Sequence, residues 1–162
     1  MRHLSFLIML LFAFSFTAKA QTTPLAKHVI LIGLDGRASH DFEEAHDVPN
    51  LLSLMEGGSY TMHKRSVIPS SSGVNWATMF MGAGPEVHGY TTWNSKTPEV
   101  SSMITNAHGI FPTIFSLVRE QDPDAETGCT FEWDGIKYVI DTLAISHVEY
   151  FSDSWNAHVF RR

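Results

Sequence analysis

Three consecutive serines, Ser70 to Ser72, stand directly before a predicted helix in the segment IPSSSGVNWATMFMGAGPEVHGY, residues 68–90. The unpaired N–H groups and partial positive charge of a helix N-terminus stabilise an anion such as phosphate. A hydroxyl at that point is therefore a candidate nucleophile toward a bound phosphoryl group. Because serine reacts poorly at neutral pH, it needs a base or a metal ion. The alternative interpretation is an ordinary serine cap of a helix over residues 72–81.

A second candidate, Asp35, follows the apolar run from Val29 to Leu34 and is flanked by Gly33 and Gly36. Ligands of open α/β sheets bind beyond the carboxyl ends of the strands, and a carboxylate there suits a divalent cation. If the strand that ends at Asp35 lies beside the one that leads to the serines, one cation would contact both side chains. The alternative is a turn aspartate, or a cap for the segment that follows.

The elements that must position these residues alternate between strands and helices. The pattern predicts a buried parallel strand over residues 29–34 and further strands over residues 60–68 and 126–133. It predicts helices from Pro49 to the glycines at 57 and 58, over residues 72–81, and within residues 111–121. Residues 84–102 read as a loop, whereas residues 134–144 suit either an extended segment or a helix. This alternation predicts an α/β fold with a mostly parallel sheet flanked by helices.

The first 20 residues have the pattern of a secretory signal peptide. A short basic start is followed by an apolar run from Leu4 to Phe16 and by the small-x-small sequence Ala18-Lys19-Ala20. The alternative, a membrane anchor, would need an apolar run of about 20 residues. The pattern therefore predicts an exported protein, periplasmic or extracellular, whose mature chain begins at Gln21 and has no membrane span.

Composition limits the partners of the mature chain. Removal of residues 1–20 takes Arg2 and Lys19 from the 11 basic residues and none of the 17 acidic ones, so the formal charge changes from −6 to −8. That balance argues against a nucleic-acid-binding surface. The single cysteine, Cys129, permits no internal disulfide and is expected to be a buried apolar residue of a strand.

The order of these motifs resembles the alkaline phosphatase superfamily, and within it the type I phosphodiesterase/nucleotide pyrophosphatase family. That family has a strand ending in Asp-Gly, a nucleophilic Thr or Ser with an Asn three residues later, and a Pro-x-x-His-Gly sequence. The resemblance covers residues 27–155 and implies that residues 21–162 form the N-terminal portion of an alkaline-phosphatase-like catalytic domain. The matching positions are Asp35, Gly36, Pro69, Ser72, Asn75, Gly82, Pro85, His88 and Gly89.

The resemblance implies a hydrolase of phosphodiester or pyrophosphate bonds that acts on a small phosphate ester with two divalent metal ions, zinc being the expected metal. Asp35 would be a metal ligand, Ser72 both a metal ligand and the nucleophile, and Asn75 would hold a phosphoryl oxygen. The alternative for Asn75 is a polar residue that satisfies nearby backbone groups. His88 is expected to be structural, and the other histidines are expected to be surface residues.

Two motifs that carry the family's remaining metal ligands, Asp-x-x-x-His and Asp-His-Gly, do not occur in this chain. One carboxylate and one hydroxyl cannot hold two dications, because catalytic zinc usually takes three protein ligands and a water. We therefore expect an incomplete fold and a truncated enzyme that is weak or inactive as written. The alternative is a secreted, non-catalytic protein that binds a phosphate-bearing ligand at the Ser72 helix N-terminus. A serine esterase is disfavoured because the sequence PSSSG lacks the Gly-x-Ser-x-Gly elbow.

Overall fold

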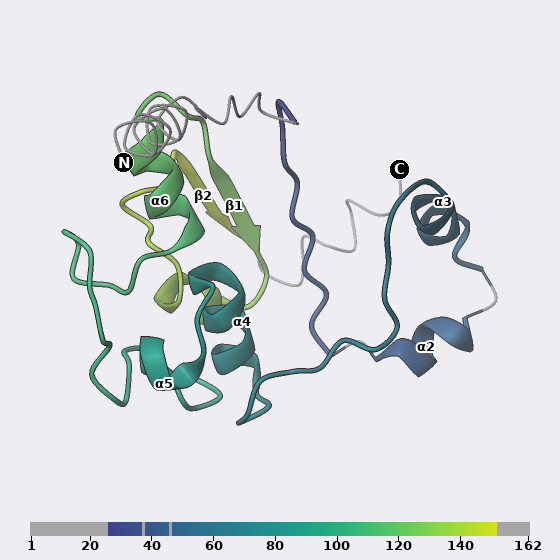
Figure 1. Cartoon of the computed structure of the whole chain (residues 1–162), viewed down its shortest axis with the longest axis horizontal. Coiled ribbons are helices and arrows are strands. Elements are labelled where there is room, and N and C mark those ends of the chain that lie inside the picture. Colours follow the sequence, from purple (N-terminus) through teal and green to yellow (C-terminus); the bar gives the residue numbers. More distant parts are fainter. Residues whose placement is uncertain (1–25, 37, 46, 152–162) are drawn as a thin grey trace, which may run out of the picture. The chain divides into compact units, whose positions relative to one another are not determined.

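The computed structural model describes residues 26–36, 38–45 and 47–151, which contain five α-helices, one 3₁₀ helix and two β-strands (Figure 1). The α-helices are α2 (Ser39–Glu43), α3 (Pro49–Gly57), α4 (Ser72–Met81), α5 (Pro85–His88) and α6 (Ile114–Gln121). The 3₁₀ helix η1 spans Asp134–Tyr138, and the strands are β1 (Gly128–Phe131) and β2 (His147–Tyr150). The chain divides into two units, residues 1–34 and 35–162. The predicted signal peptide lies outside the described residues.

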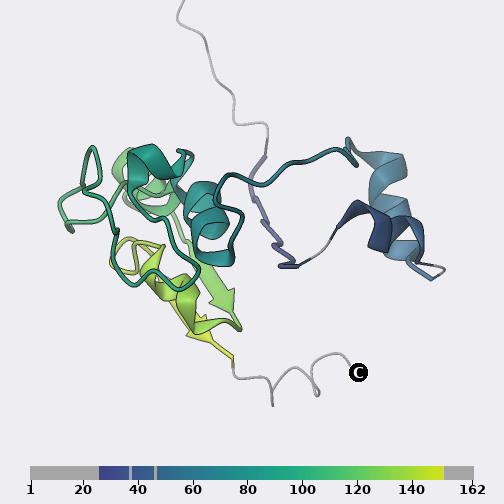
Figure 2. The same cartoon turned by 90° about the horizontal axis from the view of Figure 1, so that it is seen from below.

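The two strands form a parallel pair in which Gly128 faces His147 and Phe131 faces Tyr150. They lie side by side in both Figure 1 and Figure 2, and the connection between them carries η1. A parallel pair requires such a crossover, because the chain must return to the end of the sheet where the first strand began. The fold is therefore mixed α/β, and the predicted parallel sheet occurs with two strands in the described part of the chain.

The strand predicted over residues 29–34 is not formed. These residues belong to the first unit, where they pair with no strand among the described residues, and the side chains of Val29 and Ile30 are 87% and 84% exposed. An apolar β-branched run becomes a strand only when a neighbouring strand accepts its backbone hydrogen bonds. The prediction of a buried parallel strand at this position is wrong for that reason.

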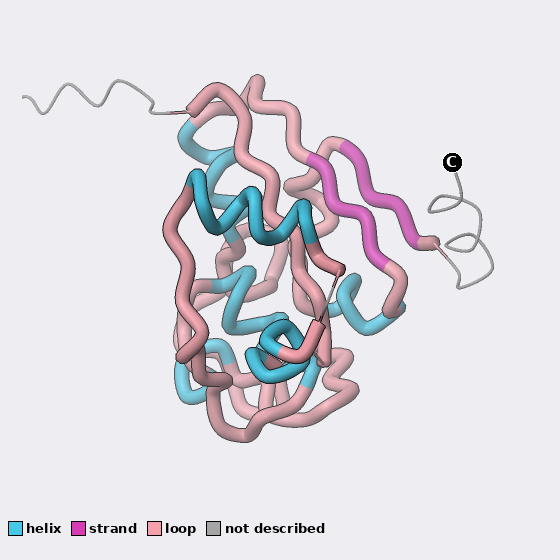
Figure 3. Tube along the Cα trace, turned by 90° about the vertical axis from the view of Figure 1, so that its right-hand side faces the viewer, coloured by secondary structure: helices cyan, strands magenta, loops and turns pink. Residues whose placement is uncertain are grey.

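The strand predicted over residues 60–68 is also absent, and the tube in Figure 3 has strands only at β1 and β2 within the described chain. Its polar groups make local contacts instead of a ladder. The Val67 amide donates to the Asn75 side chain at 3.2 Å, and the Ser66 hydroxyl donates to Ser70 at 2.9 Å. The segment therefore serves as a connection into α4.

The helix predicted over residues 72–81 is confirmed as α4, with those bounds. Its buried positions recur three and four residues apart, which gives one apolar face, and they are Gly73, Val74, Ala77, Phe80 and Met81. The helix ends because Gly82 adopts a left-handed conformation, with φ of 63°, and its amide donates to the carbonyl of Thr78. Glycine is favoured there because a side chain would strain this backbone conformation.

The remaining elements agree in part with the sequence pattern. The helix that begins at Pro49 is α3, the predicted helix within residues 111–121 is α6, and the strand within residues 126–133 is β1. The loop predicted over residues 84–102 contains the short helix α5. The segment over residues 134–144, for which a strand or a helix was open, begins with the 3₁₀ helix η1. The short elements α2 and β2 were not predicted.

The core brings α4 together with α6, η1 and β1. Residues from all of these elements and from the loops between them are buried in one cluster or packed against it, and Ala77, Phe80 and Met81 are the buried members from α4. Cys129 lies in strand β1, as expected, but it is half-buried against this cluster rather than buried, and burial raises the pKa of its thiol. The buried members of the cluster are Ala77, Phe80, Met81, Tyr90, Phe111, Phe131, Ile136, Val139, Ile140 and Ile145.

Candidate functional site

The three serines before α4 have three different environments. Ser70 is exposed and accepts a hydrogen bond from Ser66 at 2.9 Å. Ser71 occupies the N-cap position, but its side chain makes no capping bond, and its Oγ is buried without a partner among the described residues. Ser72 is the first helical residue and is half-buried, and its hydroxyl makes no hydrogen bond within the described chain. The simple interpretation as a capping serine is therefore wrong for these side chains.

The first turn of α4 also presents backbone donors. The Gly73 amide donates to the carbonyl of Trp93 at 3.1 Å, and the Asn75 amide donates to the carbonyl of Ser71 at 3.0 Å. The amides of Ser72 and Val74, by contrast, have no acceptor among the described residues. Two free N–H groups beside a free hydroxyl can receive the oxygens of an anionic ligand.

Asn75 holds the segment that carries the serines. Its Oδ1 accepts a hydrogen bond from the Val67 amide at 3.2 Å, and its Nδ2 donates to the carbonyl of Ser71 at 3.0 Å. This is the backbone-satisfying arrangement that the sequence left open as the alternative for Asn75. One N–H of the side-chain amide remains after these contacts, because an amide nitrogen carries two.

The side chain of Asp35 contacts α4 by a hydrogen bond from Trp76. Asp35 Oδ2 accepts a hydrogen bond from Trp76 Nε1 at 3.2 Å, while its Oδ1 accepts from the Gly36 amide at 2.8 Å. Trp76 lies four residues after Ser72, so both side chains share one face of α4. Trp76 also stacks on Phe80 with ring centroids 5.7 Å apart, which ties the contact to the core. Helical spacing from Ser72 was the sequence signal that could have identified Trp76.

The residues present do not complete a site for two metal ions. No group of three or more His, Cys, Asp or Glu side chains in the described part of the chain is arranged to hold a metal. Asp35 and Ser72 offer one carboxylate and one hydroxyl, whereas a catalytic zinc usually takes three protein ligands and a water. Both oxygens of Asp35 already accept a hydrogen bond. Asp35 and Ser72 could therefore supply only some of the ligands that a single metal ion needs.

The loop that follows α5 packs against the first turn of α4 through the backbone of Thr92 and Trp93. A Cβ atom at Gly73 would lie 2.7 Å from the carbonyl oxygens of both Thr92 and Trp93, so only glycine fits at this position without a shift. The Trp93 ring lies 6.3 Å from that of Trp133, which precedes η1, and the two are tilted by 33°. The residue after Ser72 is thus fixed by close backbone contact.

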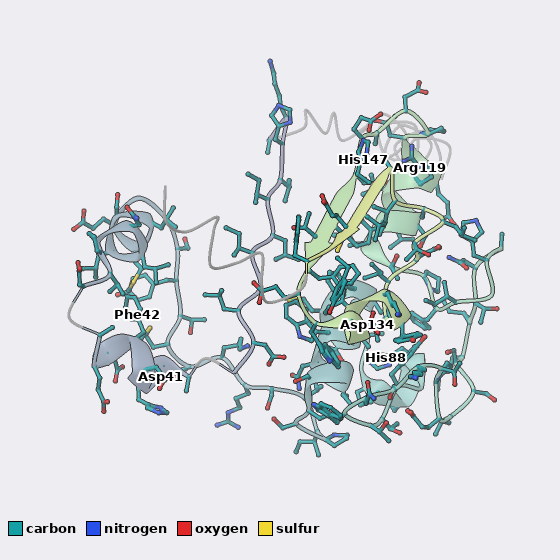
Figure 4. All side chains as sticks on the ribbon, turned by 180° about the vertical axis from the view of Figure 1, so that it is seen from behind. Asp41, Phe42, His88, Arg119, Asp134 and His147 are labelled. Atoms are coloured by element: carbon teal, nitrogen blue, oxygen red, sulfur yellow. The ribbon has the colours of Figure 1, made fainter. Side chains whose placement is uncertain are left out.

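His88 is a structural residue, as expected. It is fully buried, its Nδ1 accepts from the Tyr90 amide at 3.1 Å, and its Nε2 lies 3.1 Å from the Thr78 hydroxyl. Figure 4 shows the labelled side chain at the short helix α5. Burial lowers the pKa of His88, and the charge of Glu86 offsets part of that effect. Because Nδ1 accepts from the Tyr90 amide, the neutral imidazole carries its proton on Nε2 and donates it to the Thr78 hydroxyl.

A buried carboxylate elsewhere in the core was not identified from the sequence. Asp141 is 2% exposed, and it accepts hydrogen bonds from Asn106 at 2.6 Å and from the Leu143 amide at 3.2 Å. His108 Nδ1 lies 2.9 Å from the same carboxylate. His108 is exposed, as expected, but it is also a partner of a buried acid. No sequence signal pairs these residues, because they are 33 positions apart.

The fold and this site define a mixed α/β protein with a free serine hydroxyl and free amides at a helix N-terminus. A family model described as type I phosphodiesterase/nucleotide pyrophosphatase matches residues 29–159, and the chain belongs to that family. The resemblance found in the motifs is confirmed. Membership suggests a hydrolase of the phosphodiesterase or pyrophosphatase kind and implies an alkaline-phosphatase-like fold. No curated protein and no solved structure matches the chain.

Proposed function

We propose that this protein is a phosphoric ester hydrolase of the type I phosphodiesterase kind, with Ser72 as its nucleophile and a small phosphodiester or pyrophosphate as its substrate. The observation that carries the proposal is the hydrogen bond between Asp35 and Trp76, because it brings a carboxylate to the helix face that bears Ser72. The family match and the free Ser72 hydroxyl support the same function.

The geometry of α4 suits the binding of a phosphoryl group. Two oxygens of the phosphoryl group would accept hydrogen bonds from the Ser72 and Val74 amides, and the remaining N–H of Asn75 would reach a third. The Ser72 oxygen would then attack phosphorus in line as the ester oxygen leaves. No described side chain lies within hydrogen-bond distance of the Ser72 hydroxyl, so its proton would pass to solvent. A divalent cation held by Asp35 and Ser72 would favour this loss by stabilising the serine alkoxide.

The proposed cofactor is a pair of divalent metal ions, with zinc as the expected metal. Asp35 and Ser72 are the ligands that this chain would contribute, and further ligands are needed because the described donors do not close a site. We therefore propose that the chain alone is weak or inactive. None of the helices in the described part of the chain has the length and hydropathy of a membrane-spanning segment. Export remains a proposal that rests on the pattern of residues 1–20.

A second candidate function is binding of a phosphate-bearing ligand without catalysis. The free amides of Ser72 and Val74 favour it, since an anion can bind there without a metal ion or a base. The two functions differ in their need for Asp35. In the hydrolase that side chain binds a cation, whereas in the binding protein its negative charge only repels the ligand.

Turnover and phosphate affinity test these functions together. The purified protein, Ser72→Ala and the neighbouring control Ser70→Ala are assayed with bis-p-nitrophenyl phosphate and zinc, and all three are expected to give the same low rate. Inorganic phosphate affinity is then measured by calorimetry with zinc and with a chelator. The hydrolase requires that zinc strengthens binding and that Asp35→Asn abolishes this gain. Binding that is unchanged by chelator and strengthened by Asp35→Asn would favour the non-catalytic function. Robust Ser72-dependent turnover would contradict the proposal that the metal site of this chain is incomplete.

A further inference from the structure

The loop that presses on Gly73 is closed at its base. The Val100 amide donates to the carbonyl of Gly89 at 3.1 Å, which joins the two ends of residues 89–100. Gly89 has a φ of 83°, and a Cβ atom there would overlap the Val100 carbonyl oxygen. The two ends of the loop are therefore fixed, and its conformation in between depends on the contacts made by the residues from 90 to 99.

One carboxylate holds the interior of this loop. Glu99 accepts hydrogen bonds from the Thr91 amide at 2.7 Å, the Thr91 hydroxyl at 3.2 Å, the Thr92 hydroxyl at 3.0 Å and the Ser95 hydroxyl at 2.9 Å. Ser95 is 3% exposed, and its hydroxyl oxygen accepts a hydrogen bond from the Thr92 amide at 3.2 Å. Four donors on one carboxylate define a single arrangement of residues 91–95.

Thr92 and Trp93, whose positions this arrangement fixes, are the residues that contact Gly73. The Trp93 carbonyl accepts from the Gly73 amide, and both carbonyls leave no room for a side chain on Gly73. The contact therefore runs from Glu99 through the loop to the residue that follows Ser72. Burial alone raises the pKa of Glu99, but the hydrogen bonds from Thr91, Ser95 and Thr92 outweigh it and lower that pKa. The carboxylate thus stays charged as an acceptor.

We propose that Glu99 is a positioning residue for the Ser72 site: it orders the loop whose Trp93 carbonyl fixes Gly73, and so sets the orientation of the Ser72 hydroxyl and amide. The role of Ser72 as a nucleophile rests on the proposed function, whereas the effect of Glu99 on the contact between Trp93 and Gly73 does not. Glu99 does not touch the phosphoryl group in this arrangement, since its oxygens are occupied by donors from its own loop.

The test compares Glu99→Gln with Glu120→Gln, an exposed glutamate of α6 that has no hydrogen-bond partner among the described residues. Amide hydrogen exchange is measured by NMR at Gly73, with the Leu117 amide of α6 as an internal reference. Glu99→Gln is expected to speed exchange at Gly73 by about tenfold relative to Leu117, and to shift the Ser72 and Gly73 amide resonances. Glu120→Gln is expected to change neither.

Inorganic phosphate affinity separates this inference from the proposed function. Glu99→Gln is expected to weaken phosphate binding about fivefold, because the amides of the first turn lose their fixed orientation. If the unchanged protein binds no phosphate, the proposed function fails, while Gly73 exchange still decides the role of Glu99. Unchanged Gly73 exchange and unchanged resonances in Glu99→Gln would overturn the inference. If Glu99→Gln does not fold, Thr91→Val, which removes one donor, is judged by the same exchange criterion.

Discussion

The indole N–H of Trp76 donates a hydrogen bond of 3.2 Å to the carboxylate of Asp35 across 41 residues of sequence. A double-mutant cycle with Trp76→Phe and Asp35→Ala tests this contact. We expect a coupling free energy of about 0.5–1.5 kcal/mol in urea unfolding, because each single change removes the same hydrogen bond. A cycle that pairs Trp76→Phe with Asp124→Ala should give none. Zero coupling for the first pair would remove the observation on which the hydrolase proposal depends.

Ser71 should behave unlike an ordinary helix cap. Replacement of a capping serine usually costs about 0.5–2 kcal/mol, but the buried Ser71 hydroxyl has no partner among the described residues. We expect Ser71→Ala to leave the free energy of unfolding unchanged or to raise it, since the change removes an unsatisfied buried group. The control is Thr113→Ala at the cap of α6, where Thr113 accepts from the Ser116 amide, and it should cost about 1 kcal/mol. Equal losses in the two variants would contradict the structure.

Gly73→Ala should destabilise the protein despite the higher helix propensity of alanine. The added Cβ meets two carbonyl oxygens at 2.7 Å, and overpacking against backbone costs about 1–3 kcal/mol. Gly57→Ala in α3 is the matched control, because no atom lies within 4 Å of its added Cβ, and it should gain at most about 1 kcal/mol. Denaturant unfolding measures both. A stabilised Gly73→Ala would show that the loop does not approach α4 as described.

His88 makes the stability of the fold fall in mild acid. Its pKa is lowered in the folded state, mainly by burial, while the unfolded chain has the ordinary value of 6.5. Below pH 6.5 the unfolded state therefore binds the proton first, so the free energy of unfolding declines until the pH reaches the lowered folded pKa. Above pH 6.5 the group contributes no slope. Urea unfolding at pH 7.5, 6.5 and 5.5 should show this decline, and it should be smaller in His88→Gln.

The buried Asp141 is predicted to matter more for stability than any surface acid. Asp141→Asn turns one acceptor oxygen into a donor that faces the amide of Asn106 and the ring of His108, at a cost of about 2–4 kcal/mol. Thermal unfolding checks this loss. Asp134→Asn breaks only an exposed ion pair with Lys137 and should have no measurable effect. A similar melting temperature for both variants would argue against a buried, satisfied carboxylate at position 141.

Local sequence predicted the helices better than the strands. Spaced apolar residues and a closing glycine were sufficient for the bounds of α4, because a helix satisfies its own backbone hydrogen bonds. The run over residues 29–34 has an equally clear pattern, yet it has no partner strand in the described part of the chain. A strand depends on a neighbour that its own residues do not specify, and that is why the prediction failed there and succeeded at β1.

The sequence by itself determined the family, the serine run at the start of α4 and the acidic character of the chain, since each depends on residue type and short spacing. The tertiary structure decided which serine is free, which residue holds Asp35, and how Asn75 and Glu99 fix the first turn of α4. Those features are hydrogen bonds and close contacts between segments that folding brings together, and the partners lie up to 41 positions apart. Residue types alone do not select such partners, because many side chains could make the same bond and packing allows only one.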